Sequence, residues 1–115
     1  MRIERKEHKM ENRFPGGSWP VMLTPFTDSN EVDYEALKEL VDWYIENGVS
    51  GLFAVCQSSE MFYLSLEERI KYAKKTVEFA AGRVPVIASG HVSEKMEDQI
   101  EELNAIAETG VDAVI

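Results

Sequence analysis

A cluster of polar side chains, Cys56-Gln57-Ser58-Ser59-Glu60, directly follows an apolar run, and His91 stands shortly after the next run. Cys56 could be a reactive thiol, Glu60 a general base and His91 a metal ligand or a substrate-specificity contact. Each has a simpler interpretation. A cysteine that ends a buried strand is more often inert, and a carboxylate there more often accepts loop N–H groups. The default interpretation of His91 is a solvated loop histidine. No second ligand stands at metal-ligand spacing from His91, so we expect no metal site.

Four residues with hydroxyl side chains, in or outside this cluster, also need an interpretation. Ser58 and Ser59 can cap the turn that follows the apolar run. Thr24 closes an earlier apolar run immediately before Pro25. Tyr63 either packs against the loop or reaches a neighbouring subunit, and we expect the packing role.

Four short apolar runs recur about every thirty residues, with a helical pattern between each pair. They are residues 20–23, 51–55, 84–88 and 111–115. This alternation predicts a parallel α/β fold, in which each run is a strand. Sites in such folds are built from loops at the carboxyl ends of several strands, which is where the polar cluster and His91 stand.

The stretches between the runs carry helix signals. Asp33 is a good N-cap for a helix through Asn47, and Ser65 with Glu68 forms a capping box for a second helix that Gly82 closes. A third helix follows the third run. We expect its buried face to hold Met96, Ile100, Leu103 and Ala107, and its solvated face to hold Glu97, Asp98, Glu101 and Glu102.

Composition limits the class of partner. The chain has 115 residues and a formal net charge of −9, from 21 acids against 12 bases. This balance argues against binding to nucleic acid or to anionic membranes. A single cysteine cannot form an internal disulfide. We expect residues 1–17 to form a charged leader that is flexible or a short strap, and this segment is too polar for a signal peptide. We therefore expect a cytoplasmic protein.

Several segments resemble one known family when they are taken together and in order. They are Leu23-Thr24-Pro25-Phe26, Val32-Asp33, Asn47-Gly48-Val49-Ser50-Gly51-Leu52, Leu64-Ser65-Leu66-Glu67-Glu68-Arg69, Gly82-Arg83-Val84-Pro85-Val86-Ile87 and Gly110-Val111-Asp112-Ala113-Val114. The chain resembles the dihydrodipicolinate synthase/N-acetylneuraminate lyase family of pyruvate-dependent class I aldolases. The resemblance implies that residues 18–115 form the N-terminal portion of a (β/α)₈ TIM barrel, about three and a half βα units.

The resemblance also implies a chemistry. Family members form a Schiff base between a lysine and the ketone of pyruvate or another 2-keto acid, without a cofactor. The catalytic lysine and tyrosine of the family would lie beyond Ile115, so we expect this chain alone to be inactive. The resemblance also implies that full-length relatives are usually homo-oligomers. An unclosed barrel would also expose the apolar inner face of its sheet.

The family resemblance assigns substrate-binding roles to residues of the polar cluster. Ser58 matches the hydroxyl residue that binds the substrate carboxylate, and Gln57 stands where relatives carry a proton-relay hydroxyl. An amide can hydrogen-bond but cannot pass a proton as a hydroxyl does. We assign substrate binding to Ser58, Gln57, Ser59, Thr24 and His91, with no catalytic residue and no metal ligand in this chain.

Two alternatives stay open. The Gln57 substitution is compatible with a non-catalytic barrel homologue that binds a keto acid. A small flavodoxin-like binding module would suit the length, although it needs five strands and only four apolar runs are visible.

Overall fold

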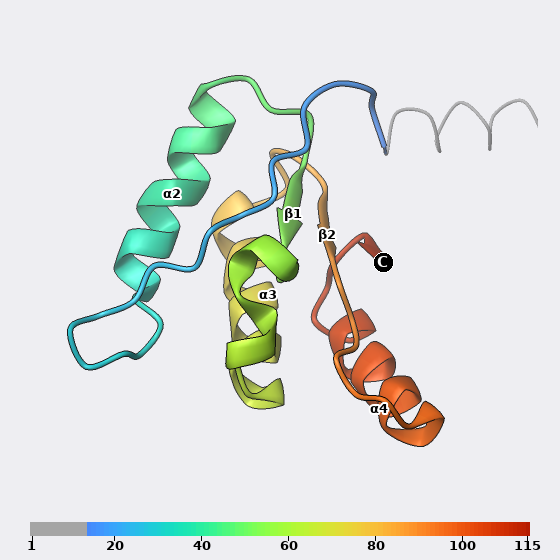
Figure 1. Cartoon of the computed structure of the whole chain (residues 1–115). Helices are drawn as coiled ribbons and strands as arrows, with labels where there is room; N and C mark the ends of the chain where they lie inside the picture. Colours follow the sequence, from blue (N-terminus) through green and yellow to red (C-terminus); the bar gives the residue numbers. More distant parts are fainter. Residues whose placement is uncertain (1–13) are drawn as a thin grey trace, which may run out of the picture.

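A computed structural model describes residues 14–115, in which helices alternate with short strands (Figure 1). The elements are α2 (Tyr34–Glu46), β1 (Leu52–Ala54), η1 (Gln57–Ser59), η2 (Met61–Tyr63), α3 (Leu66–Ala80), β2 (Val86–Ala88), α4 (Met96–Ala107) and β3 (Ala113–Val114), where η marks a 3₁₀ helix. The predicted alternation is confirmed. Most of the predicted leader, residues 1–13, lies outside the described residues. Its last residues touch the fold, since the Trp19 indole N–H donates to the Pro15 carbonyl at 2.9 Å.

The three strands form one parallel sheet in the order β1-β2-β3. In this register Phe53 pairs with Ile87, and Ile87 pairs with Ala113. In a flavodoxin-like sheet the second strand would be an edge. Here β1 pairs with β2 on one side and with residues 20–23 on the other. Chain order and strand order therefore agree, as in a barrel, and the flavodoxin-like alternative is wrong.

The first apolar run is less regular than the predicted strand. It pairs with β1 through a single parallel bridge between Val21 and Phe53. The Met22 N–H donates to the Phe53 carbonyl at 2.9 Å, and the Phe53 N–H donates to the Pro20 carbonyl at 3.0 Å. Pro20 has no N–H to donate, so the ladder cannot extend past it towards the N-terminus.

Local signals place the ends of the helices where they were predicted. The Asp33 carboxylate accepts the Ala36 N–H at 3.0 Å and caps α2. At α3 the Ser65 hydroxyl accepts the Glu68 N–H at 3.1 Å, while the Glu68 carboxylate accepts the Ser65 N–H at 2.8 Å. Both capping predictions are confirmed. The chain leaves α3 through a left-handed residue, Ala81 (φ 51°), directly before the glycine predicted to end this helix.

The helices cover one face of the sheet. Helix α3 packs between α2 and α4 and contacts both β1 and β2 (Figure 1). The core holds Leu37, Val41, Leu52, Tyr72, Val86 and Ile106, all buried. On the opposite face Phe53 and Ile87 are half-buried, while Val21, Leu23 and Ile115 are exposed. The expected exposure of an apolar inner face is therefore confirmed.

Helix α4 is rotated relative to the prediction. Met96 and Ile100, predicted to be buried, are 69% and 52% exposed, whereas Glu102 and Ile106 are the buried residues of this helix. The prediction that Glu102 lies on the solvated face is therefore wrong. The cause is an ion pair with Arg69, which is itself buried in α3.

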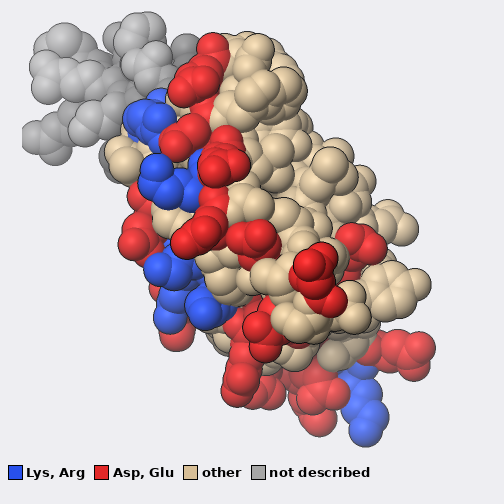
Figure 2. All heavy atoms as spheres, turned by 90° about the vertical axis from the view of Figure 1, so that its left-hand side faces the viewer, with Lys and Arg blue, Asp and Glu red and all other residues tan. Residues whose placement is uncertain are grey.

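Charged side chains interleave on the side of the molecule where α2 lies (Figure 2). Asp42 in α2 bonds to Lys38 at 3.3 Å and to Arg83 at 2.7 Å. The hydrogen bond from Arg83, followed by that from Lys38, lowers the pKa of the Asp42 carboxyl. Exposed pairs of this kind contribute little to stability, so packing holds α2 in place.

Candidate functional site

A hollow of about 320 Å³ opens where β1 and β2 end. Its lining residues are Val21, Phe53, Cys56, Gln57, Ser58 and Ser89. Val21 and Phe53 come from the helix-free face of the sheet, whereas the other four come from the loops that follow β1 and β2. The hollow thus combines an apolar side with a polar rim, a pattern typical of small-molecule sites.

A strained backbone sends the chain from β1 to this rim. Val55 has φ 44°, a left-handed conformation that is unusual for a β-branched residue. Such strain costs on the order of 1 to 3 kcal/mol and concentrates at functional sites. After this turn the chain forms η1, which carries Gln57 and Ser58 to the hollow.

The hydroxyl of Ser59 is used within the loop. It accepts the Cys56 N–H at 3.1 Å and donates to the Met22 carbonyl, and the residue is fully buried. Thr24 completes the connection, because its hydroxyl donates to the Ser59 carbonyl at 2.5 Å. Neither Ser59 nor Thr24 lines the hollow. Both hydroxyls therefore form hydrogen bonds that hold the first apolar run against the loop.

Tyr72 of α3 also contacts the first apolar run. Its phenol donates to the Leu23 carbonyl at 2.7 Å. Burial is the largest influence on this phenol and raises its pKa, although hydrogen bonds with Thr24 and Ser59 oppose the shift. Tyr72 therefore stays protonated and keeps this donor at physiological pH.

Two expectations for the end of the loop are wrong. Glu60 is exposed and makes no side-chain hydrogen bond that caps η2, so the expected role as an acceptor of loop N–H groups is not observed. Its backbone is left-handed (φ 62°), which turns the chain from η1 into η2. Tyr63 was expected to pack against the loop, but it is 84% exposed.

His91 is exposed and does not line the hollow. Its loop is fixed by Glu102, whose carboxylate accepts the N–H groups of Val92 and Ser93 at 3.2 Å each. Sequence reasoning missed Ser89, which does line the hollow. The sequence could have predicted this position, because Ser89 directly follows the third apolar run and so lies at the carboxyl end of a strand.

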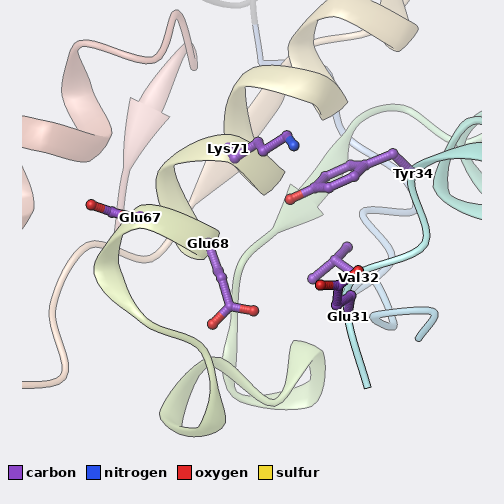
Figure 3. Close-up of a pocket in the computed structure, with 6 residues that line it drawn as sticks. All are labelled: Glu31, Val32, Tyr34, Glu67, Glu68 and Lys71. Atoms are coloured by element: carbon purple, nitrogen blue, oxygen red, sulfur yellow. The ribbon is translucent and has the colours of Figure 1, made fainter. Parts of the chain in front are cut away.

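A second hollow, of about 400 Å³, lies between the start of α2 and the first turns of α3 (Figure 3). It is lined by Glu31, Val32, Tyr34, Glu67, Glu68 and Lys71. The Lys71 ammonium lies 4.5 Å from the centre of the Tyr34 ring. Burial, followed by the charge of Glu68, raises the pKa of the Tyr34 phenol. The cation and one carboxylate are already engaged within the protein, since Glu68 caps α3.

Lysine side chains lie away from the first hollow in the described part of the chain. Those with described positions are Lys38, Lys71, Lys74, Lys75 and Lys95, and they belong to α2, α3 and the N-cap of α4.

Residues 14–115 also hold no group of three His, Cys, Asp or Glu side chains that could bind a metal. None of their helices is long and apolar enough to cross a membrane.

Comparison with known proteins agrees with this geometry. A profile of the Dihydrodipicolinate synthetase family matches residues 14–115. A 4-hydroxy-tetrahydrodipicolinate synthase from Pseudoalteromonas atlantica (strain T6c / ATCC BAA-1087) is 39% identical over 99 residues, which are 86% of this chain and 33% of that protein. This chain therefore spans about a third of the length of that relative.

Solved structures that resemble this chain belong to the same family. One crystal structure of a dihydrodipicolinate synthase has 42% identity and a TM-score of 0.79, over 85% of this chain and 33% of that one. The chloride-inhibited dihydrodipicolinate synthase from Acinetobacter baumannii, solved with pyruvate, has 34% identity and a TM-score of 0.80 over the same shares. The fold thus matches the N-terminal part of the TIM barrel of these enzymes, and the chain belongs to the dihydrodipicolinate synthetase family.

Proposed function

We propose that this chain supplies the carboxylate-binding part of the substrate site in a Schiff-base lyase or aldolase that uses pyruvate or another 2-keto acid. One observation carries the proposal. Gln57 and Ser58 line a hollow at the carboxyl ends of two neighbouring parallel strands, where sites of this fold are built. The solved relative with bound pyruvate supports the ligand class.

Each rim residue has a proposed role that fits its position. Ser58 donates a hydrogen bond from its hydroxyl to the substrate carboxylate. Gln57 offers an amide that can hold a polar group but cannot relay a proton. Thr24 and Ser59 act indirectly by holding the loop through their mutual hydrogen bond. His91, outside the hollow, contacts only a substrate large enough to extend along the rim.

Binding and chemistry are separate in this proposal. Imine formation needs an amine at the hollow, and the described lysines lie on helices instead. The chain alone is therefore proposed to bind a keto acid reversibly and to form no covalent adduct. The complete activity would need a lysine and a tyrosine at the hollow, and neither type is among its lining residues.

The surroundings of the protein are inferred from its composition. We propose a cytoplasmic location and a small 2-keto acid as ligand, with neither nucleic acid nor a membrane as partner. The net charge of −9 supports the second point, because phosphate-rich surfaces repel such a chain. Assembly of the complete protein into a homo-oligomer is proposed from the family resemblance.

Titration of the isotope-labelled chain with pyruvate tests the binding proposal. We expect the amide signals of Gln57 and Ser58 to shift in a saturable manner, and Ser58→Ala to weaken binding about tenfold or more. Ser29→Ala is the matched control, because Ser29 lies in an exposed turn away from the hollow. Borohydride added during the titration should trap no adduct. A lack of saturable shifts in the wild-type chain would refute the proposal.

Gln57 favours a second candidate, a non-catalytic homologue that binds a keto acid. Its amide occupies the rim where a proton relay would be needed. Borohydride trapping with the natural gene product distinguishes the two candidates. That product should yield a pyruvyl adduct with borohydride if it is an aldolase. Binding of pyruvate without an adduct would support the non-catalytic candidate.

A further inference from the structure

Ser89 is held at the hollow by the pairing of β1 and β2. Ala88, the last residue of β2, is fully buried and pairs with Ala54 of β1. Because successive side chains of an extended chain alternate between faces, Ser89 points away from the helices. The Ser89 N–H donates to the Val55 carbonyl at 2.9 Å, which fixes its backbone beside the strained turn.

Polar groups at this rim are free to bind a ligand. Among residues 14–115, the side chains of Gln57, Ser58 and Ser89 make no hydrogen bond to one another or to the rest of the fold. The buried hydroxyl of Ser59, in contrast, both donates and accepts. The loops thus use one serine for their own structure and leave two serine hydroxyls facing a common space.

We propose that Ser89 is a substrate-contacting residue whose hydroxyl donates, together with that of Ser58, to the carboxylate of the bound 2-keto acid. This inference rests on the proposed function. A carboxylate offers two oxygens with about four acceptor sites, so a single hydroxyl leaves it incompletely bound. Ser89 supplies a donor from the neighbouring strand, while Val21 and Phe53 form the apolar side that suits the methyl group of pyruvate.

The charge of the ligand provides a selective test. Hydrogen bonds to a charged acceptor are stronger than those to a neutral one, by roughly a factor of two in free energy. A donor that contacts the carboxylate should therefore matter more for pyruvate than for pyruvamide. A serine that only maintains the loop would affect both ligands equally.

We would measure the dissociation constants of both ligands by amide-shift titration of the 115-residue chain. Ser89→Ala should weaken pyruvate binding about tenfold and pyruvamide binding less, while Ser29→Ala leaves both unchanged. Ser89→Gly is a second variant in case the first perturbs the loop, and unshifted amide signals of α3 verify the fold. An equal loss for both ligands would show a structural role and overturn the inference.

The outcomes separate the two proposals. If wild-type chain and Ser89→Ala bind pyruvate equally while Ser58→Ala does not, the inference about Ser89 fails and the proposed function stands. If the wild-type chain itself does not bind pyruvate, the proposed function fails and the role of Ser89 fails with it.

Discussion

Arg69 of α3 and Glu102 of α4 form a buried ion pair, in which Nη1 donates to Oε2 at 2.8 Å and both side chains are only 6% and 5% exposed. The same carboxylate accepts the N–H groups of Val92 and Ser93. The guanidinium lies 3.4 Å from the Gly90 carbonyl as well. One ion pair thus joins two helices to the loop that begins with Ser89.

Removing the charge of Glu102 should strongly destabilise the fold. Glu102→Gln leaves the buried Arg69 guanidinium without its counter-charge, and breaking a buried pair in this way costs about 3 to 5 kcal/mol. Urea unfolding followed by circular dichroism measures the loss. Glu78→Gln removes an exposed partner of Lys75 and should change stability by about 0.5 kcal/mol or less. Equal effects of the two substitutions would contradict the prediction.

Acid should lower the free energy of unfolding through protonation of the Glu102 carboxyl. Burial alone would raise the pKa of Glu102, but hydrogen bonds from Ser93, Arg69 and the Val92 N–H outweigh it and hold the pKa at about 2, below the ordinary 4.5. The unfolded state therefore binds the proton more tightly, and the stabilisation is complete above about pH 4.5 and lost as pH falls towards 2.

Urea unfolding at several pH values in this window checks the sign of the effect. The wild-type chain should lose stability more steeply than Glu102→Gln as pH falls, because the variant lacks the titrating group. Parallel curves for the two proteins would show that other carboxyls cause the acid sensitivity.

Substitution of the adjacent residues Ser58 and Ser59 by alanine should affect different properties, ligand binding for Ser58 and stability for Ser59. Ser59→Ala leaves the buried Cys56 N–H and Met22 carbonyl without their hydroxyl partner, which costs about 1 to 3 kcal/mol. Ser58 is exposed, and Ser58→Ala should change stability by about 0.5 kcal/mol or less while it weakens pyruvate binding. Thermal unfolding and ligand titration of both variants separate the effects. A stable Ser59→Ala protein would refute the structural role.

Gly51 is expected to tolerate no side chain. A Cβ at this position would lie 2.2 to 2.6 Å from three atoms of the Trp19 ring. Gly51→Ala should therefore cost about 1 to 3 kcal/mol through displacement of the indole. Gly16→Ala, which meets nothing within 4 Å, is the matched control. In a double-mutant cycle, Trp19→Ala should remove most of the penalty, and additive losses would contradict the steric explanation.

Local features of this protein could be predicted from sequence because their determinants lie within a few residues. The Asp33 cap and the Ser65–Glu68 capping box use partners three positions apart. The apolar runs predict parallel strands, and parallel strands bring their carboxyl ends to one edge. The position of the polar cluster at a rim therefore followed from the order of elements.

Tertiary structure decided which side chains face the hollow and which are buried. Ser59 is buried and Ser58 is exposed, because the Ser59 hydroxyl bonds to the Cys56 N–H and to the carbonyl of Met22, which lies 37 positions earlier. Glu102 is buried because its partner, Arg69, lies 33 positions earlier and reaches it only after α3 and α4 pack together. The sequence by itself determined the elements and their order. Contacts across such separations depend on how the helices rotate against the sheet, which no local pattern encodes.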